Sequence, residues 1–333
     1  MAHVRQIAQR PHPVPSADHD RVRDYIRAQF ARLGLETSIQ AGIGSFGADL
    51  SPVENIVARL PGTDNTRPVL LVAHYDSVPT APGASDDGHG VAALIETLRA
   101  LRSAPQLRND VIFLLTDGEE QGMRGAALFC NEHPWRNDPA LVLNFDARGT
   151  GGQVTMFETT EGNEWLVREL RAAVPDANAT SLGYEVSKRM SNPTDLTGFK
   201  RAKLAGMNFA FIDHPELYHS PADDPAHLDP RSLQEQGTYA LALARGFGAM
   251  DLRDRKSGDA VYFAWRLTPL VVYPVFWVKP IAWATLLALT GGIGIALHRR
   301  RRGVVVGALL AMPAAVLLWV AGVAPGARSV FSK

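Results

Sequence analysis

The stretch VLLVAHYD, residues 69–76, is an unbroken apolar run that leads directly into a histidine and an aspartate. A strand with one exposed face alternates apolar and polar side chains, so an unbroken run is typical of a strand buried on both faces of a parallel sheet. Similar runs recur along the chain. The sequence therefore predicts strands at residues 55–60, 69–73, 111–115, 141–145 and 207–212.

Helical patterns open the chain and separate these strands. Apolar residues from Val22 to Leu33 recur at helical spacing, and Gly34 follows them as a stop signal. Further helices are expected at residues 91–102, 164–173 and 232–247. Alternating strands and helices predict an α/β fold with helices on both faces of a largely parallel sheet.

The charge of the chain is unevenly distributed. The 333 residues carry a formal net charge of zero, but no Asp or Glu follows Asp259, whereas eight of the 34 Lys and Arg residues do. The preceding body is therefore acidic, with 34 acidic against 26 basic residues, which argues against nucleic acid as a partner. The single cysteine, Cys130, excludes an internal disulfide and a cysteine-rich metal site.

The basic tail contains two apolar runs, at about 280–297 and 304–324, each near the roughly 20 residues that cross a bilayer. Four arginines, Arg299–Arg302, lie between them and are difficult to place inside a soluble fold, where the runs would be two buried core helices. We therefore predict a body at 1–255, a juxtamembrane linker at 256–279, and a transmembrane helix hairpin at 280–333.

The positive-inside rule places the arginine loop in the cytoplasm and the body on the extracytoplasmic or lumenal side. However, the N-terminal residues MAHVRQIAQRPHPVPS contain no apolar signal core that would export the body. Two readings stay open here: an upstream segment precedes this sequence, or the body is cytoplasmic.

Polar side chains follow the predicted strands. In open α/β sheets, ligands bind beyond the carboxyl ends of the strands, so these side chains are expected at one edge. So many carboxylates would repel one another without cations. Imidazole and carboxylate ligands without thiolate favour zinc, or manganese or cobalt, and two ions sharing a carboxylate could activate a water. The residues are His74, Asp76, Asp86, Asp87, Glu119, Glu120, Asp146 and His219.

Four motifs carry a family resemblance. AHYDSVPTAPGASDDG, TDGEEQGMRGA, NFDARGTGG and YHSPADD resemble, in order and spacing, the co-catalytic dizinc aminopeptidase family, which includes glutamate carboxypeptidase II and glutaminyl cyclase. The similarity is greatest to its membrane-anchored branch, the vacuolar membrane protease and endoplasmic reticulum metallopeptidase type, and covers roughly residues 5–250. It implies a three-layer α/β sandwich with a mixed, largely parallel central sheet.

The resemblance also implies two zinc ions and their ligands. His219 has neighbouring histidines at His214 and His227, and the family pattern of Tyr-His before a small residue favours His219. The implied ligands are His74 and Asp146 for one zinc, Glu120 and His219 for the other, and Asp86 as the bridge between them.

Further roles follow from the same resemblance. Glu119 resembles the general base that deprotonates the metal-bridging water, and Asp76 the carboxylate that orients the His74 imidazole. Asp195, in NPTDLTGF, matches an acid near the substrate pocket, although Leu196 departs from the usual Phe, and Tyr218 is expected to contact substrate.

The loop around Asp86 carries three more expectations. In the family the peptide bond after the bridging aspartate is commonly cis, so we expect a cis Asp86–Asp87 bond with only Asp86 facing the metals. His89 is expected at the rim of the site, because the family usually has a small residue there. His12 is expected to be structural.

The implied activity is a zinc-dependent metallopeptidase, with aminopeptidase as the first choice and a peptide with a free N-terminus as substrate. Glutaminyl cyclisation on the same fold uses a single zinc, whereas the five ligand positions here favour two. Another amide hydrolase, or a receptor-like binding domain without catalysis, are the remaining alternatives; retention of Glu119 and all five ligands argues against the latter.

Overall fold

The computed structural model describes residues 1–46, 49–189, 193–265 and 268–298. Its main sheet has eight strands in the order β1-β2-β4-β3-β5-β8-β6-β7. The central strands β4, β3, β5 and β8 are mutually parallel, whereas β1, β2 and β6 run antiparallel to their neighbours toward the centre of the sheet. The strands are β1 (Ser38–Phe46), β2 (Asp49–Leu60), β3 (Val69–His74), β4 (Val111–Thr116), β5 (Leu141–Phe145), β6 (Thr155–Thr159), β7 (Asn178–Ala179) and β8 (Ala205–Ala210).

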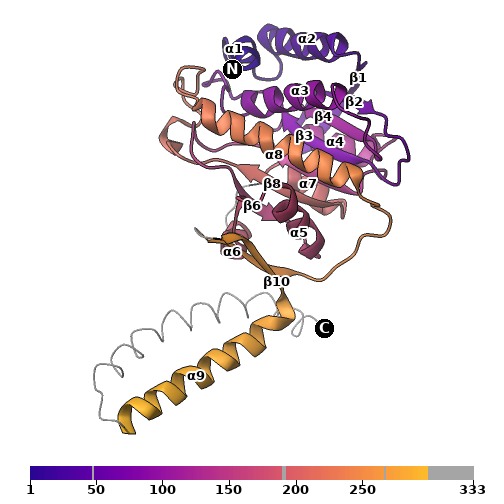
Figure 1. The fold of residues 1–333 in the computed structure, drawn as a ribbon. Coiled ribbons are helices and arrows are strands. Elements are labelled where there is room, and N and C mark those ends of the chain that lie inside the picture. The colour runs from indigo at the N-terminus through magenta and orange to yellow at the C-terminus, as the bar shows by residue number, and fades with distance from the viewer. Residues whose placement is uncertain (47–48, 190–192, 266–267, 299–333) are drawn as a thin grey trace.

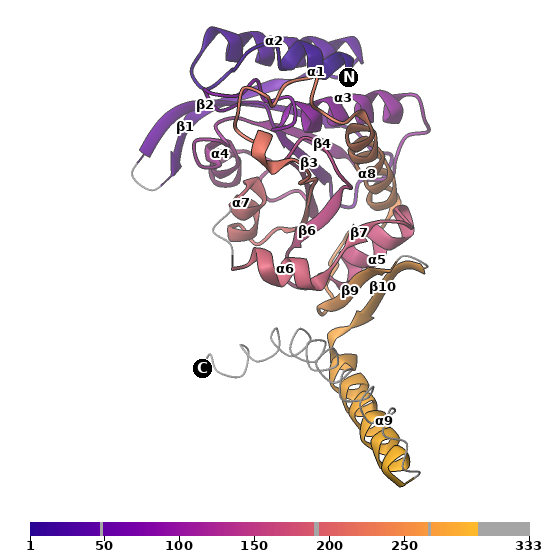
Figure 2. The same cartoon turned by 90° about the vertical axis from the view of Figure 1, so that its left-hand side faces the viewer.

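Helices cover both faces of this sheet, as Figures 1 and 2 show. The first face carries α3 and α8, with α5 beside α8 and with α1 and α2 packed on α3, whereas α4 and α7 cover the second face. The helices are α1 (Ala2–Ile7), α2 (Ala17–Arg32), α3 (Gly88–Arg102), α4 (Arg124–Glu132), α5 (Glu164–Ala173), α6 (Ser181–Ser187), α7 (Asp195–Arg201) and α8 (Pro230–Ala249).

The strand pattern explains the two cores. In β3, Val69, Leu71 and Ala73 belong to the core beneath α3 and α8, whereas Leu70 and Val72 belong to the core beneath α4 and α7. Successive side chains of a strand point to opposite faces, so an unbroken apolar run supplies both cores at once. The predicted α/β sandwich with a mixed, largely parallel sheet is confirmed.

Predicted and observed elements agree best where the pattern is strongest. The helix at 164–173 coincides with α5, and α2 ends just before Gly34, whose φ of 73° is in the left-handed region that glycine adopts readily. β8 begins and ends two residues before the predicted strand at 207–212. The sequence analysis missed β1, β6, β7, α1, α4, α6 and α7.

A β-hairpin occupies most of the segment predicted as a linker. β9 (Ala260–Trp265) pairs with β10 (Thr268–Pro274), and Thr180 forms an isolated bridge with Phe263 that connects the hairpin to the β7 end of the body. A short 3-10 helix, η2 (Val275–Trp277), follows and leads into α9.

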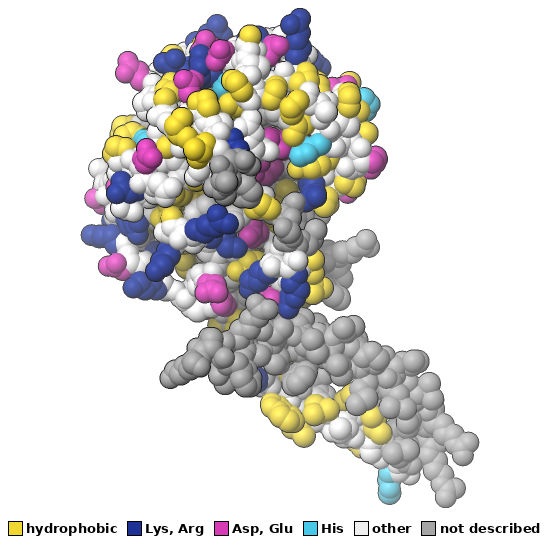
Figure 3. Space-filling model, turned by 180° about the vertical axis from the view of Figure 1, so that it is seen from behind, with side chains coloured by type: hydrophobic (Ala, Val, Ile, Leu, Met, Phe, Trp, Pro, Cys, Tyr) yellow, Lys and Arg dark blue, Asp and Glu magenta, His cyan; other side chains and the backbone are white. Residues whose placement is uncertain are grey.

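Helix α9 (Val278–His298) extends away from the body (Figures 1 and 2). Among the described residues, Val275–Ile295 is the one helical stretch long and apolar enough to cross a membrane, with a mean hydropathy of 1.4 and 6% of it buried. In Figure 3 the coloured part of this helix shows mainly hydrophobic side chains, whereas the body shows charged side chains of both signs among hydrophobic and other ones. The second predicted span, 304–324, and the loop Arg299–Arg302 lie outside the described residues.

Candidate metal centre

Four adjacent parallel strands bring the predicted ligands to one edge of the sheet. His74 is the last residue of β3, and Asp146 follows β5 directly. Glu119 and Glu120 lie in the turn after β4, and His219 follows the 3-10 helix η1 (Pro215–Leu217) that comes after β8. Since parallel strands share their carboxyl edge, side chains 145 residues apart in sequence meet there.

Two groups of potential ligands share one carboxylate. His74, Asp86 and Asp146 form the first triad, and Asp86, Glu120 and His219 form the second; within each, the ligand atoms lie within 4.8 Å of one another. These are the five residues that the sequence analysis assigned to two zinc ions, in the same division. The structure thus brings all five together, while the number of ions they hold stays a prediction.

Asp86 joins the triads through both of its oxygens. Its Oδ1 lies 3.1 Å from His74 Nε2, and its Oδ2 lies 3.1 Å from His219 Nε2. His219 Nε2 is also 3.1 Å from Glu120 Oε2. One carboxylate oxygen facing each group is the geometry that a bridging ligand requires.

The donor set fits a divalent cation. Glu120 Oε1 is buried and, among the described residues, has no hydrogen-bond partner. Among the described residues, no Lys or Arg pairs with the carboxylates of the two triads, and their ion pairs are with histidines. A buried, unpaired carboxylate is strongly unfavourable, so a cation is the partner that this cluster lacks.

The pKa values of the ligand side chains also reflect an excess of buried negative charge. Burial, followed by repulsion from Asp86, raises the pKa of Glu120 to about 7 and that of Asp146 well above its usual range. Burial lowers the pKa of His219, but hydrogen bonds to Asp86 and Glu120 outweigh it and raise the pKa to about 9. Burial raises the pKa of Asp86, yet its contacts with the two histidines bring it below the usual value. A bound divalent cation would offset this repulsion and favour the charged form of the carboxylates.

Asp76 connects the first triad to the turn after β4. Its Oδ1 lies 3.4 Å from His74 Nδ1, and its two oxygens accept the backbone N–H groups of Glu119 and Glu120 at 3.1 and 3.2 Å. One buried carboxylate therefore orients an imidazole ligand and holds both glutamates in place. This geometry agrees with the orienting role predicted for Asp76.

Asp223 supports the bridging aspartate, and the sequence analysis assigned it no role. Its carboxylate accepts the backbone N–H groups of Ser85 at 2.7 Å and of Asp86 at 3.1 Å. The available signal was its position in YHSPADD, four residues after His219, but nothing in the sequence indicated a contact with a loop 137 residues away.

The loop around Asp86 confirms the predicted cis peptide bond and contradicts the predicted position of His89. The Asp86–Asp87 bond is cis, as predicted. Asp87 faces away from the triads, because it accepts the backbone N–H groups of His74 and Gly90, both at 3.0 Å. The prediction that His89 lies at the rim is wrong: it sits in the first turn of α3, fully buried, with its ring packed on Phe211 at 4.6 Å. The helix start turns this side chain into the core.

A cavity of about 550 Å³ adjoins the second triad. Glu119, Glu120, Met123, Pro193 and Tyr218 are among its lining residues. The Tyr218 ring stacks on the His219 ring with centroids 3.7 Å apart. The structure thus places Tyr218, a predicted substrate contact, beside a predicted metal ligand.

Asp195 is buried, whereas a residue that contacts substrate directly would be exposed in the cavity wall. It is 1% exposed at the start of α7, and its Oδ2 accepts a short hydrogen bond from the Thr116 hydroxyl at the end of β4. Its Oδ1 is buried and has no partner among the described residues, and burial raises its pKa to about 7. Its role in binding substrate stays a prediction.

The site is a buried carboxylate cluster that fits a cation, at the carboxyl edge of a mixed α/β sheet, with a further glutamate beside it. This arrangement is typical of the class of metal-dependent hydrolases. Within that class, the chain belongs to peptidase family M28, whose family model matches residues 55–244. This confirms the resemblance drawn from the four motifs.

The chain is similar to two kinds of peptidase, one named for the vacuolar membrane and one for the endoplasmic reticulum. It is 31% identical over 267 residues to the vacuolar membrane protease of Candida albicans, covering 78% of this chain and 31% of that protein. It is 29% identical over 258 residues to human endoplasmic reticulum metallopeptidase 1, covering 72% of this chain and 28% of that protein. The chain thus spans about a quarter to a third of the length of these relatives.

Solved structures share the fold. A glutaminyl cyclase from Tannerella forsythia has a TM-score of 0.61 at 18% identity, covering 73% of this chain and 96% of its own. An aminopeptidase from Aneurinibacillus has a TM-score of 0.61 at 13% identity, covering 73% and 91%. Because these two neighbours have different activities, the shared fold alone does not identify the reaction of this chain.

Asp86 belongs to both triads, so Asp86→Ala is expected to lose metal at both positions, whereas Glu120→Ala removes a ligand from one triad and should lose about half as much. Elemental analysis of dialysed protein measures both. His227→Ala is the matched control, because the exposed His227 imidazole contacts half-buried Asp224 outside the triads. Full metal content in Asp86→Ala would show that Asp86 is not the shared ligand.

Proposed function

We propose that this chain is a membrane-anchored zinc metallopeptidase that binds two zinc ions and removes residues from the N-terminus of peptides. The observation that supports it best is the pair of triads that share Asp86, with the Glu119 carboxylate beside them. Zinc is the first choice among metals, with manganese or cobalt as alternatives, because the ligands are imidazoles and carboxylates without thiolate.

Bound divalent cations supply Lewis acidity that polarises a substrate carbonyl and lowers the pKa of water. The ligand division proposed for them is His74 and Asp146 on one side, Glu120 and His219 on the other, and Asp86 between. Asp76 and Asp223 then act through their hydrogen bonds, holding His74, the glutamate turn and Asp86 in place.

Glu119 is proposed as the general base. It lies outside both triads, it lines the 550 Å³ cavity, and the hydrogen bonds recorded for it among the described residues involve its backbone. Its carboxylate is therefore available to accept a proton from the attacking water and to donate it to the leaving amine. Adjacent Glu120 serves as a ligand, so the two neighbouring carboxylates have different tasks.

A free N-terminal amine is proposed as the recognised feature of the substrate. A free amine offers a neutral nitrogen that could ligate a bound cation, and Glu119 and Glu120 line the cavity beside the second triad. Tyr218 and Met123 offer apolar surface in the cavity for the first side chain. Asp195 is proposed to support this end of the site from beneath, through Thr116.

Replacing Glu119 by Gln is expected to reduce kcat by at least about 100-fold, because an amide cannot accept the proton, while metal content stays nearly unchanged. Steady-state hydrolysis of aminoacyl reporters and elemental analysis on the same sample measure both quantities. Near-normal turnover in Glu119→Gln would refute the assignment of the base. Glu216→Gln serves as the control, since Glu216 is exposed and pairs with His214.

Glutaminyl cyclisation is the second candidate, because a glutaminyl cyclase shares the fold with a TM-score of 0.61. A panel of aminoacyl amides, the same peptides with blocked N-termini, and N-terminal glutaminyl peptides separates the two reactions. Cleavage restricted to free N-termini is expected. Pyroglutamyl product without cleavage would favour the cyclase, cleavage of blocked peptides an endopeptidase or another amide hydrolase, and no reaction with any substrate a receptor-like domain.

The membrane part of the proposal rests on α9 and on the sequence beyond it. We propose that α9 is the first helix of the hairpin predicted at 280–333, that residues 1–255 form the peptidase domain, and that the body faces the extracytoplasmic or lumenal side. Arg299–Arg302 would then lie in the cytoplasm. The relative named as a vacuolar membrane protease supports a membrane location.

Protease added outside intact cells that carry the full chain at their surface is expected to digest the acidic body. Immunoblotting against the body measures its loss, and lysed cells provide the control in which either orientation is digested. A body that is protected in intact cells and cleaved after lysis would place it in the cytoplasm and reverse the proposed orientation.

A further inference from the structure

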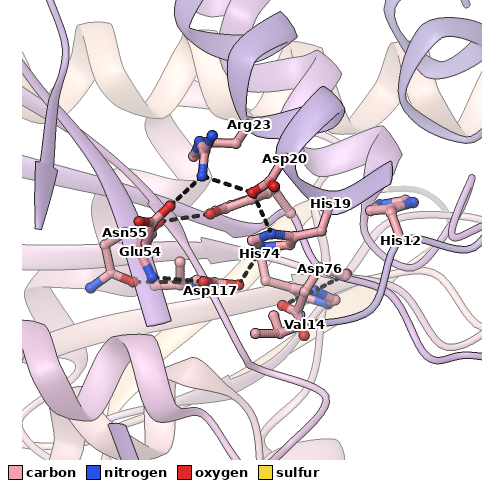
Figure 4. Close-up of polar contacts among 12 residues, drawn as sticks. His12, Val14, His19, Asp20, Arg23, Glu54, Asn55, His74, Asp76 and Asp117 are labelled. Carbon is pink, nitrogen blue, oxygen red and sulfur yellow. Dashed lines mark hydrogen bonds and ion pairs between the residues drawn. The ribbon is translucent and has the colours of Figure 1, made fainter. Parts of the chain in front are cut away.

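The segment between Arg10 and Arg23 lies beside the ends of β3 and β4, and Figure 4 shows its residues His12, Val14 and His19 near His74, Asp76 and Asp117. It contains the first half of α2, and it lies outside the part of the chain that the family model matches, residues 55–244. Four of its contacts reach the ends of β3 and β4, where His74, Glu119 and Glu120 are located. The N-terminal segment therefore touches the two strand ends that carry most of the proposed machinery.

The first contact is a buried pair between α2 and the turn after β4. His19 Nε2 lies 2.8 Å from Asp117 Oδ1, and the two side chains are 5% and 1% exposed. The second oxygen of Asp117 accepts the backbone N–H of Glu54 at 2.7 Å. Both oxygens are thus engaged, which fixes the residue two positions before Glu119.

The second contact is on the other side of the two glutamates. Gln121 Nε2 donates a hydrogen bond of 2.7 Å to the backbone carbonyl of Val14. The turn from Asp117 to Gln121 is therefore held at both ends by the N-terminal segment. Asp76 holds its middle, through the N–H groups of Glu119 and Glu120.

The third and fourth contacts reach the end of β3. The His19 ring stacks on the Tyr75 ring, with centroids 4.9 Å apart and an interplanar angle of 24°. Tyr75 lies between His74 and Asp76, and its hydroxyl donates to the carbonyl of Glu54 at 2.7 Å. In addition, the backbone N–H of His12 donates to Ser77 Oγ at 2.8 Å. The single side chain of His19 therefore contacts residues after both strands.

We propose that His19 is a positioning residue of the active site: by binding Asp117 and packing on Tyr75, it sets the turn so that Glu119 reaches the substrate and Glu120 reaches the cation. The inference rests on the proposed function and extends the site to a segment outside the matched family region. Removal of such outer supports typically costs about 10- to 100-fold in activity or metal affinity.

The test compares three variants of the full chain. His19→Ala removes the contact, and His19→Gln keeps an N–H donor of similar reach. Arg23→Ala is the matched control, because Arg23 lies one turn further along the same helix and pairs with Asp20 and Glu54, but not with the turn at 117–121. It therefore weakens the docking of α2 without removing the support of the glutamates.

Three quantities are measured at matched folded fraction: kcat and KM, zinc affinity by chelator competition, and amide hydrogen exchange of residues 117–121. For His19→Ala we expect kcat to fall about 10- to 100-fold with KM within about two-fold, weaker binding of one zinc equivalent, and faster exchange of the turn. His19→Gln should recover most of each loss. Arg23→Ala should leave all three near wild type.

Equal values in His19→Ala and Arg23→Ala would overturn the inference, because His19 would then only dock the helix. Loss confined to KM, or unchanged exchange of the turn, would overturn it as well. If His19→Ala fails to fold, Asp117→Asn is read with His19→Gln by the same criteria. A wild-type chain that hydrolyses nothing would refute the proposed function, yet zinc affinity and hydrogen exchange would still decide the role of His19.

Discussion

The bridging position of Asp86 between two imidazoles is the interaction on which the rest of the site depends. Several buried carboxylates meet at this edge, and each charge taken out of water costs several kcal/mol unless it is paired. Histidines contact only some of these oxygens, and Glu120 Oε1 has no partner among the described residues. A cation in each triad would neutralise the cluster, so its binding and the stability of this edge are linked.

The scaffold holds three of the five ligands, Asp86, His74 and Glu120, by contacts from outside the cluster. Asp223 holds the Asp86 loop, and Asp76 holds His74 together with the backbone of both glutamates. These supports accept backbone N–H groups, which hold the ligands without adding positive charge. The negative charge of the cluster is therefore not neutralised by these supports, and its ligands lose conformational freedom. Ligands held in place in this way favour metal binding.

Local sequence patterns predicted the parts of the fold that depend on local chemistry. The unbroken run before His74 predicted a strand buried on both faces, and the five ligand positions follow strands that the pattern identified. Two of the missed strands carry a weak local pattern: β7 has two residues, and β1, which pairs with the neighbouring strand β2, contains two glycines. His89 was misjudged because only the start of α3 decides which way it points. The partnership of His19 with Asp117, 98 residues apart, leaves no local signal.

The apolar helix α9 and the site connect to different parts of the body. The site strands β4, β3, β5 and β8 form its centre, whereas the hairpin that leads into α9 joins the body at the β7 end, through the Thr180–Phe263 bridge. β6 and β7 separate this attachment from β8. Figures 1 and 2 show α2, which contacts the glutamate turn through His19, at the end of the body away from α9. If α9 anchors the body at a bilayer, as proposed, the geometry of the glutamates is set from the opposite end of the body.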